Sequence, residues 1–519
     1  MALTFMLMLL LGNFTTMAAS TPITCGSRGA SPDCFKEPSD EFAGSVSQII
    51  GLLKDIVSIL SKFRGVTAGN LHLNNAILDS LELLDLSSDE LGSSVSAIQN
   101  SKGRNNSTQN ALLGSNLTTW LSAVLANLDT IVDGFEGTTS IIAGLISTGL
   151  RQVTSLVKNL LAGIDNPKND FFDSVGEGRR FPSWVKPEER NLLEAHGVTP
   201  DVVVAADGTG NFTRVTDAVL AAPEKSEKRF VIYVKRGVYN EYVEIQKNKW
   251  NIVMIGDGIG ATVITGNRNY VDGFTTFRTA TFAVVGRGFI ARDITFKNTA
   301  GPEKKQAVAL RTDSDLSIYF RCEITGYQDS LYTHSMRQFF RECTISGTVD
   351  FIFGYATAFF QKCNILVKKG LPKQRNAITA QGRKDPHETT GFSLQFCNIT
   401  ADSDLVPFVN TTESFLGRPW KPYSRTIFLQ NYISDVISPL GWTPWNDSNF
   451  WLDTLYYAEY MNTGAGAGLD KRVKWPGYRV LKSSDEASNF TVAKFIEGNL
   501  WLPSTGVAFT AGFENEVVV

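Results

Sequence analysis

The chain has 519 residues, which is more than a single hydrophobic core normally serves, so at least two domains are expected. Its formal net charge of −3 gives no basic excess, which argues against a nucleic-acid-binding protein. Only four His are present, and none is spaced with Cys or another His as in zinc sites. We therefore expect neither a metal nor a cofactor.

The first 20 residues resemble a secretory signal. An apolar run, Phe5–Leu11, precedes small residues at 18–20, although the usual Lys or Arg before such a run is missing. The run is too short for a permanent anchor and no later stretch is long and apolar enough, so we expect a secreted protein without a membrane anchor. Eight N-x-Ser/Thr sequons after the signal fit an exported glycoprotein. They begin at Asn105, Asn106, Asn116, Asn211, Asn398, Asn410, Asn446 and Asn489.

Residues 25–165 have the pattern of a four-helix bundle. Cys25 and Cys34 flank a short segment with Gly and Pro and are close enough in sequence for a disulfide. Four stretches with apolar residues at helical spacing then follow, separated by polar breaks. These stretches are Phe42–Phe63, Leu73–Ile98, Leu117–Phe135 and Thr139–Ile164. No acid, base and nucleophile are grouped in them, so a binding or folding module is expected.

Residues 166–200 are rich in Pro, Gly and charge, which indicates a linker between two domains. The stretches Gly178–Phe181 and Arg190–Leu193 carry basic residues that a processing protease can recognise in an exposed segment. An uncleaved inter-domain linker explains the composition equally well.

From residue 201 to 519 the pattern changes to short apolar runs separated by Gly, Asn and Asp. Runs such as Asp201–Ala205, Phe230–Val234 and Ile252–Ile255 predict strands and turns. One helix is expected near Val215–Ala222, where it would cover the open end of a repeat fold.

A triplet Cys-x-Ile recurs in the middle of this region, starting at Cys322, Cys343 and Cys363, at intervals of 21 and 20 residues. A period near 20, rich in β-branched and aromatic residues, predicts stacked β-coils. Equivalent residues of neighbouring coils would lie about 4.8 Å apart. Arg292-Asp293-Ile294 and Cys397-Asn398-Ile399 look like an earlier and a later member of the series.

Asp329 and Asp350 each stand seven residues after a repeat Cys, so stacking in register would make them neighbours. Two carboxylates that close cannot both ionise freely, and one pKa should rise while the partner stays anionic. Such a pair supplies an acid and a nucleophile. The alternative is that both are solvated turn residues, a common position for Asp in β-proteins.

The three repeat cysteines are expected to form a column in which neighbours are within disulfide reach. Three thiols allow one bond among them, and buried free Cys is a common core residue. The sequence pattern alone leaves the pairing open.

Five motifs in this region are similar to the signature set of plant pectin methylesterases, and they occur in the family's order. They are Gly237–Glu241, Gln306–Arg311, Gly326–Tyr332, Val349–Gly354 and Leu416–Trp420. The N-terminal half resembles the inhibitor domain that many of these enzymes carry as a pro-region. The resemblance covers nearly all of the C-terminal half.

The resemblance implies an all-β, right-handed parallel β-helix preceded by an all-α four-helix bundle. It implies hydrolysis of the methyl ester of galacturonate units in pectin (methyl-esterified homogalacturonan) in the cell wall, and contact with the chain's own inhibitor-like pro-region. Asp350 would be the nucleophile and Asp329 the proton donor and later base. Gln328 with Gln306 would stabilise the oxyanion, while Arg418 would hold Asp350 ionised. Thr276 and Trp420 would line the sugar cleft with Arg418. The implied disulfide joins Cys343 and Cys363.

Elementary chemistry fits these roles. A carboxylate is a weak nucleophile, so it needs a cation that fixes its charge and donors aimed at the developing oxyanion. Trp420 offers a flat apolar face to a sugar ring, but a lone Trp is often a core residue. Gln306 is equally compatible with a side-chain ladder along the coils.

The chain departs from the family pattern in the bundle, where a second Cys pair is replaced by Ser80 and Ile131. Loss of such a bridge typically removes about 2–5 kcal/mol from a small domain. We therefore expect a weaker free-standing inhibitor than in the family, while a pro-region role is less affected.

Two other classes of function are compatible with parts of this pattern. A polysaccharide lyase or glycoside hydrolase on a β-helix would need calcium-binding acids or carboxylates placed at an anomeric carbon. A non-catalytic wall-binding or inhibitory protein would be favoured only if Asp329 and Asp350 lie apart. A serine esterase is unsupported because Gly-x-Ser-x-Gly does not occur in the chain.

Overall fold

The structure is a computed structural model that describes residues 40–65, 69–101, 107–138, 140–164, 199–513 and 517–518. The expected signal at 1–20, the Cys25–Cys34 pair and the linker residues 166–198 lie outside the described residues, as do Asn105 and Asn106. All elements described below belong to one compact unit, residues 37–519.

Four long helices form the N-terminal part. They are α2 (Asp40–Ser61), α3 (Leu71–Ser101), α4 (Ser107–Gly134) and α5 (Ile141–Ala162). Each turns an apolar stripe inward, as in α2, where Val46, Leu53 and Leu60 are fully buried. The expectation that no later stretch is long and apolar enough to cross a membrane is wrong for Glu41–Ser61 of α2, which meets that test by length and composition. Its stripe is instead part of the core that the four helices share.

Helix α4 begins ten residues before the predicted start at Leu117. The added turns are rich in Asn, Ser, Thr and Gly, which are weak helix formers, and their few apolar side chains hide the helical period. Leu113 packs with Leu117 and Ile98 in a small cluster that anchors these turns. At the two positions without the family's Cys pair, Ser80 donates to Ala76 O at 2.6 Å and Ile131 is buried in the shared core.

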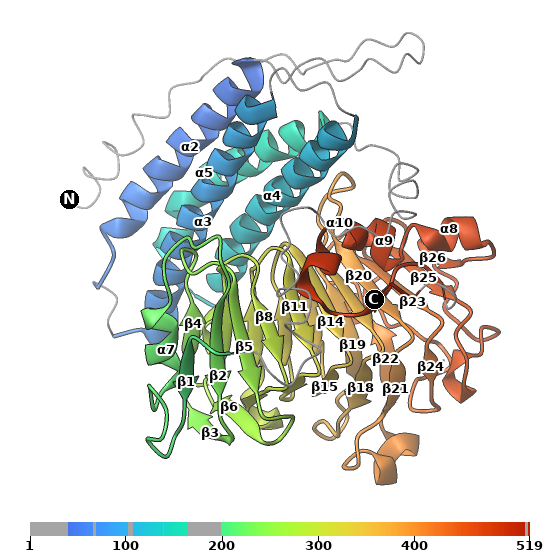
Figure 1. The fold of residues 1–519 in the computed structure, drawn as a ribbon. Helices are drawn as coiled ribbons and strands as arrows, with labels where there is room; N and C mark the ends of the chain where they lie inside the picture. The colour runs from blue at the N-terminus through green and yellow to red at the C-terminus, as the bar shows by residue number, and fades with distance from the viewer. Residues whose placement is uncertain are drawn as a thin grey trace. The chain divides into compact units, whose positions relative to one another are not determined.

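The C-terminal part contains three parallel sheets, coloured green to red in Figure 1. The first sheet contains β1 (Val202–Val204), β2 (Phe230–Val234), β5 (Ile252–Gly256), β8 (Ile290–Arg292), β11 (Ser317–Phe320), β14 (Arg337–Arg341), β17 (Thr357–Gln361), β20 (Gly391–Gln395), β23 (Arg425–Leu429), β25 (Tyr456–Tyr460) and β26 (Tyr478–Val480). The second contains β3 (Gly237–Asn240), β6 (Thr262–Gly266), β9 (Thr295–Asn298), β12 (Glu323–Thr325), β15 (Thr344–Gly347), β18 (Asn364–Val367), β21 (Asn398–Ala401) and β24 (Tyr432–Ile433). The third contains β4 (Val243–Ile245), β7 (Phe282–Val284), β10 (Leu310–Thr312), β13 (Leu331–Thr333), β16 (Ile352–Gly354), β19 (Asn376–Gln381) and β22 (Ser414–Gly417).

Successive coils contribute one strand to each sheet, so the chain winds as a parallel β-helix. The predicted fold class, a β-helix preceded by a four-helix bundle, is confirmed. Helix α7 (Val215–Ala221) packs Val215 and Val219 on the first coil. Short elements complete the fold. They are α8 (Ser484–Ser488), α9 (Val492–Phe495), α10 (Gly498–Trp501), the hairpin β27 (Phe509–Thr510) and β28 (Val517–Val518), and the 3-10 turns η2 (Phe277–Thr279), η3 (Pro302–Lys304), η4 (Val406–Thr411), η5 (Trp445–Asp447), η6 (Ala465–Ala467) and η7 (Leu502–Thr505).

The corner between the first and second sheets has the same backbone conformation in consecutive coils. One non-glycine residue there has a positive φ, which lets the chain turn sharply between two strands. These residues are Asp293, Arg321, Glu342, Lys362, Phe396 and Gln430. The residue after each corner points into the core, and this column contains the repeat cysteines.

The register supports the repeat with one correction. Ile324, Ile345, Ile365 and Ile399 pair in sequence along the second sheet, so the triplet at 397–399 belongs to the series. The expected earlier member, 292–294, is wrong by two residues, because Phe296 pairs with Ile324. The shared corner, rather than the apolar triplet, fixes the register.

The cysteines differ from the expectation drawn from the resemblance. Cys322, Cys343, Cys363 and Cys397 are buried and free, so Cys343 and Cys363 form no disulfide here. The Cys343 thiol donates to Tyr319 O at 3.1 Å, and the Cys363 thiol donates to Phe340 O at 3.5 Å. Each sulfur is thus directed at backbone of the preceding coil, where it acts as a small core residue.

Candidate active site

Asp329 and Asp350 stand at equivalent places in two successive coils. β13 pairs with β16 so that Leu331 lies opposite Ile352, and each Asp precedes its strand residue by two positions. Both have left-handed backbone, with φ of 61° and 50°. Their side chains line one cleft of about 650 Å³. The stacking therefore brings together two acids that are 21 residues apart in the chain.

Arg418 binds Asp350 through two parallel hydrogen bonds. Its Nε lies 2.8 Å from Oδ1 and its Nη2 lies 2.6 Å from Oδ2. The guanidinium also lies over the Trp445 ring, 4.2 Å from its centre. A bidentate pair of this kind fixes both the charge and the orientation of a carboxylate.

Asp329 has a different environment, although the two acids are neighbours. Burial raises the pKa of Asp329 well above its ordinary value, and the Asp350 charge raises it further, while Arg418 opposes this. The raised pKa favours the protonated form of Asp329, and Asp350 is the carboxylate that Arg418 pairs.

The other predicted site residues line the same cleft. Thr276, Gln306, Gln328 and Trp420 all contribute to its wall. The backbone N–H of Ala307 donates to Gln328 O at 3.2 Å, which holds the two glutamines on adjacent coils. The amide oxygen of Gln306, Oε1, is buried without a hydrogen-bond partner among the described residues.

The aromatic wall continues beyond Trp420, whose ring lies 4.8 Å from Tyr355 and 5.8 Å from Phe353. Trp445 and the cations Lys384 and Lys421 also line the cleft, and sequence reasoning missed all three. The position of Lys421, directly after the Leu416–Trp420 motif, was the available signal. Lys384 and Trp445 lie in loops that no repeat marks.

Comparison with known proteins agrees with this geometry. Residues 201–499 match the family described as Pectinesterase, which is more than half of the chain. The chain belongs to the pectinesterase family. It is therefore a carboxylic ester hydrolase. Residues 32–162 match the family described as Plant invertase/pectin methylesterase inhibitor.

Similar proteins carry both parts. The chain is 63% identical over 481 residues to Pectinesterase/pectinesterase inhibitor PPE8B of Prunus persica, covering 92% of this chain and 91% of that protein. It is 59% identical to Probable pectinesterase/pectinesterase inhibitor 32 of Arabidopsis thaliana, covering 92% of each. A solved structure titled Pectin methylesterase from Carrot is 54% identical, with a TM-score of 0.61, and covers 62% of this chain and 100% of its own.

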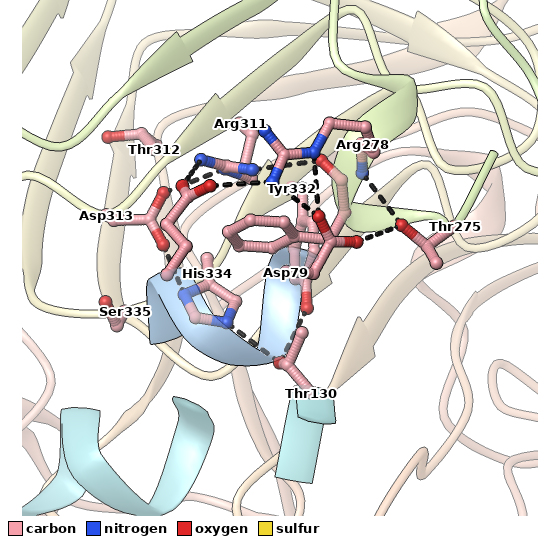
Figure 2. A network of polar contacts seen from close by, with 12 residues as sticks. Asp79, Thr130, Thr275, Arg278, Arg311, Thr312, Asp313, Tyr332, His334 and Ser335 are labelled. Atoms are coloured by element: carbon pink, nitrogen blue, oxygen red, sulfur yellow. Dashed lines mark hydrogen bonds and ion pairs between the residues drawn. The ribbon is translucent and has the colours of Figure 1, made fainter. Parts of the chain in front are cut away.

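In this pectinesterase the bundle contributes acids to the region around the cleft (Figure 2). Asp79 of α3 accepts from Arg278 Nε at 2.7 Å, and its second oxygen accepts from the Thr275 hydroxyl. Glu82, one helical turn further, lies 2.7 Å from Arg278 and 3.4 Å from Arg311. Asp79 and Thr275 both belong to the cleft wall.

A second polar chain runs from α4 into the third sheet. Thr130 lies 2.8 Å from His334 Nε2, and His334 Nδ1 lies 2.5 Å from Asp313. Arg311 binds the other oxygen of Asp313 at 3.0 Å. Apolar residues of the four helices and of the β-helix, including Phe277 and Tyr332, belong to the same buried cluster. The contact between the two parts therefore has both an apolar centre and buried polar links.

Proposed function

We propose that the β-helix hydrolyses the methyl ester of galacturonate units in pectin and releases pectate and methanol. The observation that carries this proposal is the asymmetry of the acid pair. Asp350 is bound by Arg418 through two hydrogen bonds of 2.8 and 2.6 Å, while burial raises the pKa of the neighbouring Asp329 well above its ordinary value. The names of the relatives give the substrate class.

In the proposed first step, an Asp350 oxygen attacks the ester carbonyl carbon and a tetrahedral oxyanion forms. Collapse of this intermediate breaks the bond to the methoxy oxygen, which takes the proton of Asp329 and leaves as methanol. Asp329 is then anionic and withdraws a proton from water. The resulting hydroxide attacks the acyl group on Asp350 and breaks its bond to the Asp350 oxygen, which frees the galacturonate carboxyl group and restores a protonated Asp329 and an ionised Asp350. The released carboxyl group then loses its proton to water.

The oxyanion is stabilised in this proposal by the amides of Gln306 and Gln328. Both side chains line the cleft with the acid pair. An amide group donates hydrogen bonds without adding charge, so it favours the developing oxyanion over the neutral ester. The O and N atoms of an amide exchange by a simple flip, so the unpartnered end of the Gln306 amide can present a donor.

Trp420 supplies a flat wall for the pyranose ring and Thr276 a polar edge, both within the same cleft. The lyase and glycosidase alternatives lack support, because the family is one of ester hydrolases. Among the described residues, moreover, no cluster of His, Cys, Asp and Glu has a metal-binding arrangement.

We propose that residues 25–165 are the pro-region and that residues 201–519 are the enzyme, which acts in the cell wall. The bundle would act as an internal inhibitor by placing Asp79 and Asp133 in the cleft wall. Release of the enzyme would require loss of this contact, for example by cleavage within 166–200.

The test uses residues 199–519 alone. The carrot structure supports this choice, because its whole length is covered by 62% of this chain, about the share that the β-helix part occupies. The β-helix also has a large core cluster made from its own residues. A β-helix without the bundle is therefore expected to fold.

Asp350→Asn should lower methanol release from methyl-esterified pectin by about 10⁴-fold, because an amide cannot form the acyl intermediate. Asp329→Ala should lower it by about 10²–10⁴-fold. Asp470→Asn, an exposed residue outside the cleft, is the matched control and should be fully active. Circular dichroism checks the fold of each variant. Turnover like that of the unchanged enzyme in Asp350→Asn would remove Asp350 from the nucleophile role.

A further inference from the structure

Two lysines of the cleft wall have no part in the mechanism proposed above. Lys384 follows β19 and Lys421 follows β22, and both line the cleft that contains Asp329 and Asp350. The two ammonium groups are close neighbours, because both contact the Asp129 carboxylate. Burial, together with the charge of Lys421, lowers the pKa of Lys384 to about 8. Two like charges held together in a cleft strongly favour an anionic ligand.

The groups that bind these lysines are carboxylates of the bundle. Lys421 Nζ lies 2.6 Å from Asp129 Oδ2 and 3.1 Å from Asp133 Oδ1. Lys384 Nζ contacts the other oxygen of Asp129, so one carboxylate bridges both ammonium groups. Among the described residues, no side chain of the β-helix forms an ion pair with either Nζ.

Tyr355 completes this arrangement. Its hydroxyl donates to Asp129 Oδ2 at 2.7 Å and lies 3.2 Å from Asp133 Oδ2. The ring of Tyr355 packs on Trp420, the proposed sugar wall. Lys421 Nζ also lies 4.9 Å from the centre of the Trp420 ring. The two cations and one hydroxyl are thus placed beside the surface where a sugar ring would lie.

We propose that Lys384, Lys421 and the Tyr355 hydroxyl form a subsite for the free carboxylate of a galacturonate unit that has already lost its methyl group. This inference rests on the proposed function. The Asp129 carboxylate stands in for the uronate carboxylate, since both present two oxygens and one negative charge. A unit that is still esterified is neutral and leaves both ammonium groups unpaired, so the subsite separates the two kinds of unit.

The consequence is a substrate preference. An ester flanked by a free galacturonate should be bound better than the same ester in a fully esterified stretch. The same three groups explain why acids of the bundle occupy the cleft, because Asp129 and Asp133 compete for the cations that recognise the product. Asp129 is 3% exposed, so this pairing takes place away from water, where charge pairs discriminate most.

The test compares two substrates with residues 199–519 alone. The double variant Lys384→Gln/Lys421→Gln is measured on fully methyl-esterified pectin and on partly de-esterified pectin. We expect about a tenfold loss of kcat/KM on the partly de-esterified substrate, mainly through KM, and less than about a threefold change on the fully esterified one. Inhibition by pectate should weaken by about tenfold. Lys471→Gln, an exposed lysine outside the cleft, should change none of these values.

A conservative variant and a binding measurement separate this inference from the proposed function. Lys384→Arg/Lys421→Arg keeps both charges and should retain the preference. Calorimetric titration of Asp350→Asn with pectate should show binding that the added Lys→Gln changes remove. Equal losses on both substrates, or unchanged pectate binding, would overturn the subsite. An unchanged enzyme that releases no methanol from either substrate would overturn the proposed function instead.

Discussion

The bundle and the β-helix both direct carboxylates at the cleft, but they align them in different ways. In the bundle, Asp129 and Asp133 are four residues apart and share one face of α4. In the β-helix, Asp329 and Asp350 come from successive coils and are aligned by strand register. The bundle acids pair with lysines, whereas Asp329 has no ion-pair partner within hydrogen-bond distance among the described residues. Asp129 and Asp133, whose charges are neutralised by lysines, are suited to covering the site. Asp329, whose pKa is raised, is suited to donating a proton.

The two regions also differ in backbone conformation. Among the described residues, every non-glycine residue with positive φ lies in the β-helix part, and none lies in the four helices. Such a residue costs roughly 1 kcal/mol relative to its relaxed conformation, so the β-helix accepts strain at its corners and at Asp329 and Asp350. The helices are relaxed, and their contribution to the cleft depends on how they dock.

Removal of the bundle should have the largest effect on the rate of methanol release by the β-helix. An internal partner acts at an effective concentration on the order of 1 mM, so even a contact with an intrinsic Kd of about 10 μM would leave about 1% of clefts open. Residues 199–519 should therefore release methanol about 100-fold faster than the intact chain, at equal enzyme concentration. Equal rates, with the linker shown intact by mass, would contradict the role of the bundle as an internal inhibitor.

A change of pH should have a smaller effect, through the docking of the bundle on the β-helix. Burial raises the pKa of Asp79, with Arg278 and the Thr275 hydroxyl opposing this and Glu82 adding to it. Burial likewise raises the pKa of Asp133, with Lys421 and the Tyr355 hydroxyl opposing and Glu136 adding. A pKa raised by docking means that protons favour the docked state. Docking should be fully supported below the ordinary Asp pKa and should weaken as pH rises through the raised values.

The activity of the intact chain, divided by that of residues 199–519 at the same pH, should therefore increase from about pH 4 upward, by at most about tenfold per pH unit for each proton released. The ratio cancels the pH dependence of Asp329 and Asp350, the acids that we propose to be catalytic. Asp79→Asn in the intact chain removes one titrating group and should flatten the ratio. A ratio that falls with rising pH would reverse the sign of the linkage.

Much of the fold followed from local patterns. Helical spacing predicted four helices because each must bury one apolar stripe, and the Cys-x-Ile interval predicted coils because a parallel sheet stacks equivalent residues. The errors arose where the local amino-acid composition hides the helical period or the coil period. The first turns of α4 are too polar, and Phe296, rather than Ile294, continues the column of Ile324.

Local motifs likewise predicted some residues of the candidate site and missed others. Asp329, Asp350 and Arg418 stand in motifs, and the coil interval itself places the two acids together. Lys384 and Lys421 come from different loops, and the acids that meet them come from α4. A contact between residues some 290 positions apart depends on docking of whole elements, which no local pattern encodes. The free thiols show the limit of family resemblance, since side-chain direction decided their bonding.

The smallest expected effect tests the backbone comparison with one substitution made in two places. Lys362 is exposed at a corner of the β-helix with φ of 53°, and Lys54 is exposed in the middle of α2. Lys54→Gly should lower the free energy of unfolding by about 1 kcal/mol, because glycine gains more chain entropy on unfolding. At Lys362 the same loss is offset by relief of the left-handed conformation, so Lys362→Gly should be neutral or stabilising by up to about 0.5 kcal/mol. Thermal melting of the intact chain provides the measurement. Equal destabilisation by both changes would mean that the corner stores no strain, and the regular positive φ along the coils would then need another cause.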